Sequence, residues 1–341
     1  MKADEIDITG DYPVYGGNGL RGYTSTYNHD GEYALIGRQG ALCGNMNYSA
    51  GKAYFTEHAV VVKADENNVT RFLYYMLDTM NLGQYSDQSA QPGLAVNKLV
   101  KLENSFPKKE EQQQIGAYFR SLDHLITLHQ RKCDEVKSLK KYMLQKMFPQ
   151  NEQKVPEIRF EGFTEAWEQR KLGEVTQCLD SERVPINSEE REKIPGEIPY
   201  YGAGNIQGYI NKFLFDEELV LLLEDGDAFD DFRTKEIAQY ICGKTWVNNH
   251  AHVLRPLGDA YFLYVTLSHK DIRNWVQLAG ASRKKLVQKS MLNIELFMPH
   301  IIEQKKIGQY FSNLDHLITL HQQKCEELKK IKKFMLQKMF V

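Results

Sequence analysis

The sequence lacks the features that mark membrane, secreted and disulfide-bonded proteins. No apolar run reaches the roughly 18 residues of a membrane-spanning helix, and the N-terminal stretch MKADEIDITGDYP holds no apolar core of a signal peptide. The five cysteines are widely spaced and form no CxxC pair, which indicates reduced thiols rather than a disulfide framework or a zinc site. We therefore expect a cytoplasmic protein without a membrane segment.

The sequence also lacks an excess of positive charge. Its 43 Lys and Arg residues stand against 45 Asp and Glu residues, which gives a formal net charge of −2. A chain with this balance that binds nucleic acid must do so through local basic loops or through partner subunits. The composition is that of an ordinary globular protein, with 42% hydrophobic and 26% charged residues.

Catalytic and metal-binding patterns are incomplete or absent. Gly243–Thr245 ends like a phosphate-binding loop, but Ala238 stands where the first glycine of GxxxxGK[ST] belongs. His124, His129 and Cys133 follow a spacing that does not converge on a metal ion, so they are expected to be face or seam residues of a helix. No Asn-Pro-Pro-aromatic motif of adenine methyltransferases occurs. We expect no active site, no metal and no cofactor.

The strongest positive signal is an internal repeat. The stretch FRSLDHLITLHQRKCDE at 119–135 returns as FSNLDHLITLHQQKCEE at 311–327, an offset of 192 residues. Outside these stretches, YPVYGGNGLRGY at 12–23 matches IPYYGAGNIQGY at 198–209, and EHAVVV at 57–62 matches NHAHVL at 249–254. The chain is therefore organised as two similar halves, each with a domain followed by a long repeated segment.

The repeated segment is predicted to be a helix of about 34 residues, about 50 Å long. One apolar stripe runs along each copy at a spacing of three and four residues. A helix of this length cannot bury such a stripe alone, and the other copy is the economical partner, in antiparallel orientation. The predicted seam consists of Leu122, Ile126, Cys133, Val136, Leu139 and Met143 in the first copy and of Leu314, Ile318, Cys325, Leu328, Ile331 and Met335 in the second.

The rest of each half consists of short β-type runs, one shorter helical stretch and glycine-rich turns. The predicted fold class is α+β, with two globular domains joined by two long helices that pair as an antiparallel coiled coil. The predicted division is a first domain at 1–107, a first long helix with linker at 108–150, a second domain at 151–299 and a second long helix at 300–341.

Several of these stretches together resemble one known family. The segments IGRQGALCG, LLEDGDAFDD and HAVV/HAHV, with the P…EQ…IGxYFxxLDxLI helices, look like the specificity subunit of type I restriction–modification systems, over nearly the whole chain. The resemblance implies two target recognition domains that each read one half of a split double-stranded DNA site. It also implies that the helix pair sets the spacing of the two readers and docks methyltransferase subunits, expected to number two, and restriction (nuclease and translocase) subunits.

Candidate DNA contacts lie on four loops that offer Arg, Lys, Asn or Gln to phosphates and base edges. They are Asn18, Arg21, Arg38, Gln39 and Asn45 in the first domain and Arg233, Lys235, Arg283, Lys284, Lys285 and Lys289 in the second. For any one of them a solvated loop charge stays an open alternative, whereas the SRKK cluster favours DNA contact. The acidic loop with Asp225, Asp227, Asp230 and Asp231 is expected to shape a turn, with cation binding or contact to cytosine as the alternative.

One departure from the family pattern separates two functions. Residues 149–186 have no counterpart ahead of the first domain, although family members usually open each half with such a segment. We therefore expect the first domain to be the weaker one, with an uncovered sheet edge. The alternative function is a degenerate or truncated specificity subunit that acts mainly as an assembly scaffold, and a third is a detached recognition region of a single-chain restriction–methylation enzyme. The recognised bases do not follow from the sequence.

Overall fold

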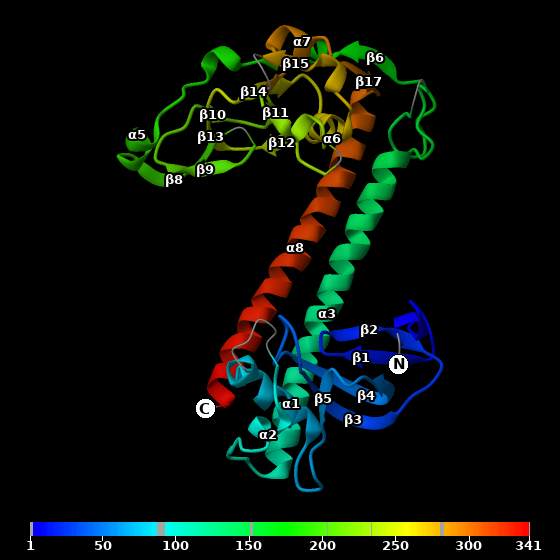
Figure 1. The fold of residues 1–341 in the computed structure, drawn as a ribbon. Coiled ribbons are helices and arrows are strands. Elements are labelled where there is room, and N and C mark those ends of the chain that lie inside the picture. Colours follow the sequence, from blue (N-terminus) through cyan, green and yellow to red (C-terminus); the bar gives the residue numbers. More distant parts are fainter. Residues whose placement is uncertain are drawn as a thin grey trace. The chain divides into compact units, whose positions relative to one another are not determined.

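The computed structural model describes residues 3–86, 93–150, 153–202, 204–232, 234–279 and 283–340. They fall into two compact units, unit 1 with Met1–Lys132 and His321–Val341, and unit 2 with Cys133–Leu320. Each unit contains one globular α+β domain and one part of each of two long helices, α3 (Lys109–Lys146) and α8 (Ile301–Met339) (Figure 1). No helix among the described residues is long and apolar enough to cross a membrane.

Unit 1 is built on a five-stranded sheet with the strand order β2-β1-β4-β3-β5. Helix α1 (Thr70–Thr79) packs against β3 and β4, and Ile36 and Leu77 are buried in one cluster while Leu35 and Phe55 are buried in another. Because Leu35 and Ile36 are neighbours on β3, they point to opposite faces of the sheet, and both faces are covered. The strands are β1 (Tyr12–Gly16), β2 (Gly19–Thr24), β3 (His29–Gly37), β4 (Met46–Phe55) and β5 (Ala59–Val62).

The remaining elements of unit 1 are short. They are the turn η1 (Ala3–Glu5) ahead of β1, the turn η2 (Leu82–Tyr85) and the one-turn helix α2 (Val96–Leu99). Asp7 exchanges two backbone hydrogen bonds with Tyr23, so the N-terminal stretch continues the sheet beyond β2.

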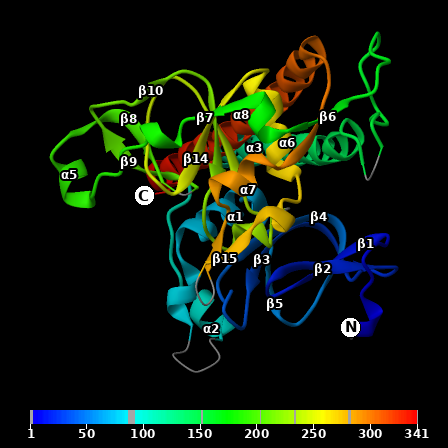
Figure 2. The same cartoon turned by 90° about the horizontal axis from the view of Figure 1, so that it is seen from above.

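Unit 2 divides the same scaffold between two four-stranded sheets, β10-β13-β8-β9 and β12-β11-β14-β7. The run Leu219–Leu223 is buried at every position, as a continuous apolar strand in a sheet covered on both faces should be. Figures 1 and 2 place β8–β10 and α5 on the side of unit 2 away from β6. The strands are β6 (Glu168–Lys171), β7 (Thr176–Cys178), β8 (Pro195–Tyr201), β9 (Ile206–Ile210), β10 (Phe215–Asp216), β11 (Leu219–Leu223), β12 (Ala238–Ile241), β13 (Lys244–Val247), β14 (Ala251–Pro256), β15 (Gln277–Ala279), β16 (Arg283–Lys285) and β17 (Glu295–Met298).

The helices of unit 2 lie between these strands. Helix α6 begins at Asp259, whose side chain accepts a hydrogen bond from the Phe262 N–H as an N-cap. The helices are α4 (Leu172–Val175), α5 (Ser188–Glu192), α6 (Ala260–His269) and α7 (Gln288–Leu292), with the short turns η3 (Asp180–Glu182), η4 (Asp227–Phe229) and η5 (Arg273–Trp275).

The two copies of the repeat make equivalent hydrogen bonds in the two units. In unit 1 the Gln112 amide donates to the Pro107 carbonyl at 2.9 Å and accepts from the Val69 N–H at 2.9 Å. In unit 2 the Gln304 amide donates to the Pro299 carbonyl at 2.9 Å and accepts from the Asp259 N–H. The glutamine near the start of each repeated helix therefore holds that helix to its own domain.

The long helices pair in antiparallel orientation, and the predicted fold class is confirmed. In unit 1 the Cys325 thiol donates to the Ile126 carbonyl at 3.5 Å, and in unit 2 the Cys133 thiol donates to the Ile318 carbonyl at 3.9 Å. Each unit thus joins an early position of one helix to a late position of the other. His129 and His321, which are repeat counterparts, meet at 3.0 Å between their Nδ1 atoms.

A half-buried group of polar side chains interrupts the apolar seam once in each unit. In unit 1 the Lys332 ammonium lies 2.7 Å from the Asp123 carboxylate, which also accepts a 2.7 Å hydrogen bond from the Tyr75 hydroxyl. In unit 2 Lys140, Asp315 and Tyr261 make the same arrangement, with 2.5 Å between Lys140 Nζ and Asp315 Oδ1. The long aliphatic stem of lysine lets it occupy an inward position while its charge reaches the carboxylate.

This arrangement corrects two of the predicted seam residues. Leu139 and Ile331 are 44% and 36% exposed. Phe119, Ile126, Cys133 and Lys140 recur every seven residues, so Lys140 takes the place in the seam that its apolar neighbour was expected to take. The other predicted seam residues are buried or half-buried: Leu122, Ile126, Cys133, Val136, Met143, Leu314, Ile318, Cys325, Leu328 and Met335.

We expect the substitution Ile126→Asp to destabilise the protein by about 2–4 kcal/mol, because it places a carboxylate without a partner in the apolar cluster around Phe119 and Leu328. Thermal unfolding followed by circular dichroism measures the effect. The matched control is Leu139→Asp, a change of the same kind at an exposed position of the same helix. Equal melting temperatures for the two variants would show that the stripe is not a buried seam.

The sheet edges of the two units differ. In unit 2, β14 is paired on both sides, with β11 and with β7. In unit 1, β5 pairs with β3, and no strand within the described part of the chain pairs with its other side. An unpaired edge opens more readily than a paired one.

We therefore expect faster amide hydrogen exchange over residues 33–62 of unit 1 than over residues 219–254 of unit 2 in the isolated protein. Exchange followed by mass spectrometry at several time points measures this difference. Equal protection of the two stretches would contradict the expectation that unit 1 has the weaker domain.

Candidate nucleic-acid interface

Three loops of unit 1 close on one another at glycine residues. A Cβ atom at Gly37 would lie 2.4 Å from the Gly17 carbonyl oxygen, and one at Gly17 would lie 2.8 Å from the His58 carbonyl oxygen. The Arg38 N–H donates to that same His58 carbonyl at 3.0 Å. The backbone approach that only glycine permits therefore gathers the β1–β2 turn, the β3–β4 loop and the β4–β5 turn.

The predicted residues of unit 1 lie on this loop cluster or beside it. Asn18 is in the β1–β2 turn and Arg21 on β2, while the β3–β4 loop carries the remaining three, and all five are exposed: Asn18, Arg21, Arg38, Gln39 and Asn45. Sequence analysis missed His58, whose side chain is half exposed and 3.8 Å from Glu57. The repeat contained the signal, because His58 in EHAVVV matches His250 in NHAHVL.

In unit 2 the β15–β16 hairpin lies against the acidic loop that follows β11. The Gly226 N–H donates to the Lys284 carbonyl at 3.2 Å, and the Leu286 N–H donates to the Glu224 carbonyl at 2.8 Å. These backbone bonds bring the predicted basic cluster and the predicted acidic loop side by side, which the sequence had treated as separate features.

The basic side chains of this hairpin are paired with the acidic loop. Lys285 lies 3.0 Å from Glu224, and Lys284 pairs with Asp230. The pair of Lys284 and Asp230 is exposed and contributes little free energy, so a phosphate can replace that carboxylate at small cost. Glu224 is largely buried and has a second partner, Arg183 at 2.7 Å. The acidic loop therefore neutralises its neighbours. Among the described residues no group of three His, Cys, Asp or Glu is placed to hold a metal.

The other predicted residues of unit 2 are more scattered. Lys235 pairs with Asp231 at 2.9 Å, and Lys289 is exposed on α7. Arg233 and the side chains of Asp227 and Arg283 lie outside the described residues.

A buried polar network contacts the residue that follows the β15–β16 hairpin. His252 is 1% exposed, with Nδ1 2.6 Å from the Asp180 carboxylate and Nε2 2.7 Å from the Leu286 carbonyl oxygen. Burial raises the pKa of Asp180, but the hydrogen bonds from His252 and from the Val253 N–H, with the Arg183 charge, outweigh it and hold that pKa below its ordinary value. The network fixes Leu286, and with it the strand that carries the basic cluster.

A family comparison identifies the scaffold that carries these loops. The family model of the type I restriction modification DNA specificity domain matches residues 1–138 and 164–330. The chain belongs to this family. The resemblance seen in the sequence is thereby confirmed.

Two curated relatives carry the same description. The chain is 51% identical over 114 residues to the type I restriction enzyme EcoprrI specificity subunit of Escherichia coli, a match that covers 33% of this chain and 28% of the relative. It is 34% identical over 161 residues to a putative type I restriction enzyme specificity subunit of Haemophilus influenzae, covering 47% and 40%. These matches thus span well under two thirds of either relative.

A solved structure matches the fold over a greater length. The crystal structure of the type I restriction–modification S subunit from M. genitalium has a TM-score of 0.78 and 18% sequence identity, and the match covers 100% of this chain and 91% of that one. At this identity the likeness shows the fold of a specificity subunit and no residue of its site.

The turn between β1 and β2 contains a sequence that matches the glycine pattern of dinucleotide-binding sites. Residues 17–22, GNGLRG, satisfy GxGxxG, a pattern that in dinucleotide-binding folds lies between a strand and a helix. Here the stretch turns directly from β1 into β2, and no helix begins there. The glycines serve the close packing of the loops, not a pyrophosphate.

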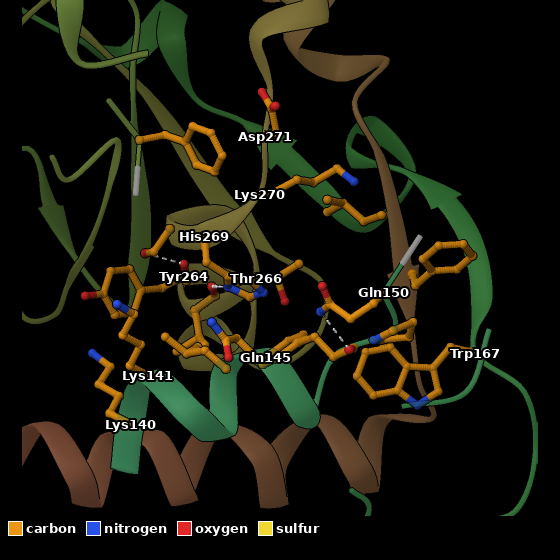
Figure 3. Close-up of a pocket in the computed structure, with 18 of the residues that line it drawn as sticks. Lys140, Lys141, Gln145, Gln150, Trp167, Tyr264, Thr266, His269, Lys270 and Asp271 are labelled. Carbon is orange, nitrogen blue, oxygen red and sulfur yellow. Dashed lines mark hydrogen bonds between the residues drawn. The ribbon is translucent and has the colours of Figure 1, made fainter. Parts of the chain in front are cut away.

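Unit 2 has a cavity of about 900 Å³ (Figure 3). Lys140 and Lys141 of α3 and His269 at the end of α6 line it. Burial lowers the pKa of His269 to about 4, so the ring is neutral at pH 7, and it packs against Phe148. No described lining residue pairs a nucleophile with a base, so the cavity offers no catalytic arrangement.

We expect Asp180→Asn to lower the free energy of unfolding by about 1–3 kcal/mol at pH 7, because it removes a charge-assisted hydrogen bond. The folded-state pKa of Asp180 lies below the unfolded value of about 3.9. Its contribution is therefore present above that value and is lost as the pH falls through the folded pKa. Denaturant unfolding at pH 7, 5, 4 and 3 should show the difference from wild type shrinking below about pH 4.

The control for this series is Asp216→Asn, at an exposed aspartate of β10 in the same unit. A difference between wild type and Asp180→Asn that stays constant across the pH series would contradict the assigned role of the Asp180 charge.

Proposed function

We propose that the chain is a sequence-specific double-stranded DNA recognition subunit, which reads a split target site with its two domains and docks methyltransferase and restriction subunits. The observation that carries this proposal is the duplicated scaffold with unlike loops. In both units a glutamine side chain holds the long helix to the domain, and a Lys–Asp–Tyr group lies in the helix seam. The corresponding loops differ: residues 37–45 of unit 1 are GRQGALCGN, and residues 224–232 of unit 2 are EDGDAFDDF. The shared helices suit a common role in assembly, and the differing loops suit the recognition of two different half-sites.

The loops supply the chemistry that DNA recognition needs. In unit 1, Arg38, Gln39 and Asn45 are exposed on one loop, and such side chains donate to phosphates and to guanine or adenine edges. In unit 2, Lys284 and Lys285 can exchange carboxylate partners for phosphates. Because the chain is nearly neutral overall, we expect modest affinity by itself and a strong dependence on salt.

The long helices supply surfaces for partners. Large apolar side chains recur at exposed and matched positions of the two copies, such as Leu125 with Leu317 and Tyr142 with Phe334. Exposed apolar side chains grouped in this way are typical of protein interfaces. Since each unit presents its own set, two copies of one partner would be accommodated, which favours two methyltransferase subunits.

The proposed role includes no catalysis, metal or cofactor of its own, and the site of action is the cytoplasm. The second candidate is a scaffold that assembles partners but reads DNA weakly, favoured by the internal pairing of Lys284 and Lys285 with acidic residues. Methylome sequencing with and without the gene separates the two. A split methylated motif that disappears with the gene supports recognition, whereas an unchanged methylome together with an intact complex supports the scaffold.

We expect the triple substitution of Arg283, Lys284 and Lys285 to Ala to weaken duplex binding by about tenfold or more and to flatten the slope of log K against log salt by about two to three. The change removes three positive charges and leaves Asp230 without Lys284, while Glu224 keeps its pairing with Arg183. Gel-shift or anisotropy titrations from low to physiological salt measure both quantities.

The matched control removes positive charge from the long helix. Lys324 and Lys329 also sit in exposed ion pairs, at 2.8 Å from Glu327 and Glu326. Alanine at these two positions should leave the salt slope unchanged. If the triple variant behaves like this control, the hairpin is not at the DNA.

A further inference from the structure

The cavity of unit 2 lies where the end of α3 meets the end of α6, and it is called the α3–α6 cavity from here on. Lys141 and Phe148 line it from α3 and the residues after it, Lys270 lines it from the end of α6, and Trp167 and Phe297 complete the lining (Figure 3). Its volume of about 900 Å³ lies in the range of about 300–1,000 Å³ that is usual for sites of small organic ligands.

One wall of the α3–α6 cavity is aromatic. Phe148 and Trp167 are 4% and 1% exposed, and their rings meet edge to face at 5.9 Å between centroids. Leu296 of β17 is buried as well, and Phe297 is half-buried. Because these side chains are already ordered by packing, they offer an apolar surface to a ligand at little cost in conformational entropy.

Most of the charges around the cavity cancel one another. The Lys140 ammonium lies 2.5 Å from the Asp315 carboxylate, and the Asp271 carboxylate lies 2.5 Å from the Arg273 guanidinium. His269 adds no charge at pH 7, because burial lowers its pKa to about 4. The net charge of the lining therefore depends on the other two lysines.

Those two lysines, Lys141 and Lys270, are uncompensated cations. Within the described part of the chain no carboxylate is in ion-pair contact with either of them. Lys270 is half-buried, and its ammonium lies 6.0 Å from the centre of the Trp275 ring. Burial lowers the pKa of Lys270, and the attraction of Glu295 and Asp271 does not outweigh this effect. An anion beside Lys270 would offset the cost of its burial.

We propose that the α3–α6 cavity binds a small organic anion with an apolar body, of which an aromatic carboxylate is the simplest example. The apolar body would pack against the rings of Phe148 and Trp167, and the anionic group would pair with Lys270. Lys141, which lies on another side of the cavity, would add positive potential (Figure 3).

Both parts of the lining are needed to define this ligand. A neutral apolar molecule would leave Lys270 without a partner, and a simple inorganic anion would leave the aromatic wall in contact with water. A bound ligand would contact residues of α3 and of α6 together, so it would stabilise the attachment of the domain of unit 2 to its long helix. This inference is independent of the proposed reading of DNA by the loops.

The test uses the full chain and naphthaleneacetate as the probe. Its matched controls are naphthaleneacetamide, which has the ring without the charge, and acetate, which has the charge without the ring. By isothermal titration calorimetry we expect saturable binding of naphthaleneacetate, binding of the amide that is at least about tenfold weaker, and no displacement by an equal concentration of acetate. Hydrogen exchange should become slower at residues 264–271 when naphthaleneacetate is bound.

A lysine variant then identifies the cation. Lys270→Met keeps an unbranched apolar side chain but removes the charge, so it should weaken binding of naphthaleneacetate by at least about tenfold and leave binding of the amide unchanged. Unchanged amide binding also shows that the variant is folded. The matched control Lys137→Met removes an exposed charge of α3 that does not line the cavity, and it should leave both affinities unchanged.

Three results would overturn the proposal. Equal affinity for naphthaleneacetate and its amide would show an apolar hollow that does not select an anion, and this comparison needs only the wild-type protein. An equal loss of affinity in Lys270→Met and Lys137→Met would show an effect of surface charge alone. Absence of saturable binding, or slower exchange confined to unit 1, would show that the α3–α6 cavity is not the site.

Discussion

The antiparallel pairing of α3 and α8 is the constraint on which the rest of the structure depends. Each helix is 38 or 39 residues long and carries one apolar stripe, which it cannot bury by itself. The polar group of Lys, Asp and Tyr in each unit adds specificity to this pairing, because a shift along the seam would bury Lys140 or Lys332 away from its carboxylate. The pair therefore has one orientation and one alignment.

This alignment also determines how each domain is attached. Gln112 and Gln304, near the helix starts, donate hydrogen bonds to the carbonyl oxygens of Pro107 and Pro299. Phe148 and Phe340, near the helix ends, pack in the aromatic cluster of a domain. Each domain is thus held by the beginning of one long helix and the end of the other. The loops take no part in these contacts and are free to differ, as the proposed reading of two unlike half-sites would require.

Electrostatics gives the loops a different character in the two units. The loops of unit 1 gather around glycine contacts and expose Arg38 and Gln39, whereas the hairpin of unit 2 pairs its lysines with its own acidic loop. Under the proposed function, internal pairing would lower the general attraction to DNA and leave more of the binding free energy to contacts that depend on sequence. This is consistent with a protein whose net charge is close to zero.

The sequence by itself determined the duplication, the two long helices, their antiparallel pairing and the α+β class, because these depend on periodicity and on identity between the copies. It could not decide between Leu139 and Lys140 in the seam, since hydrophobicity favours the leucine and only the carboxylate of Asp315 explains the lysine. The sequence also did not predict that Lys284 pairs with Asp230 or that His252 is buried against Asp180. Those contacts join residues far apart in the chain, and only the tertiary structure brings them within reach of a hydrogen bond.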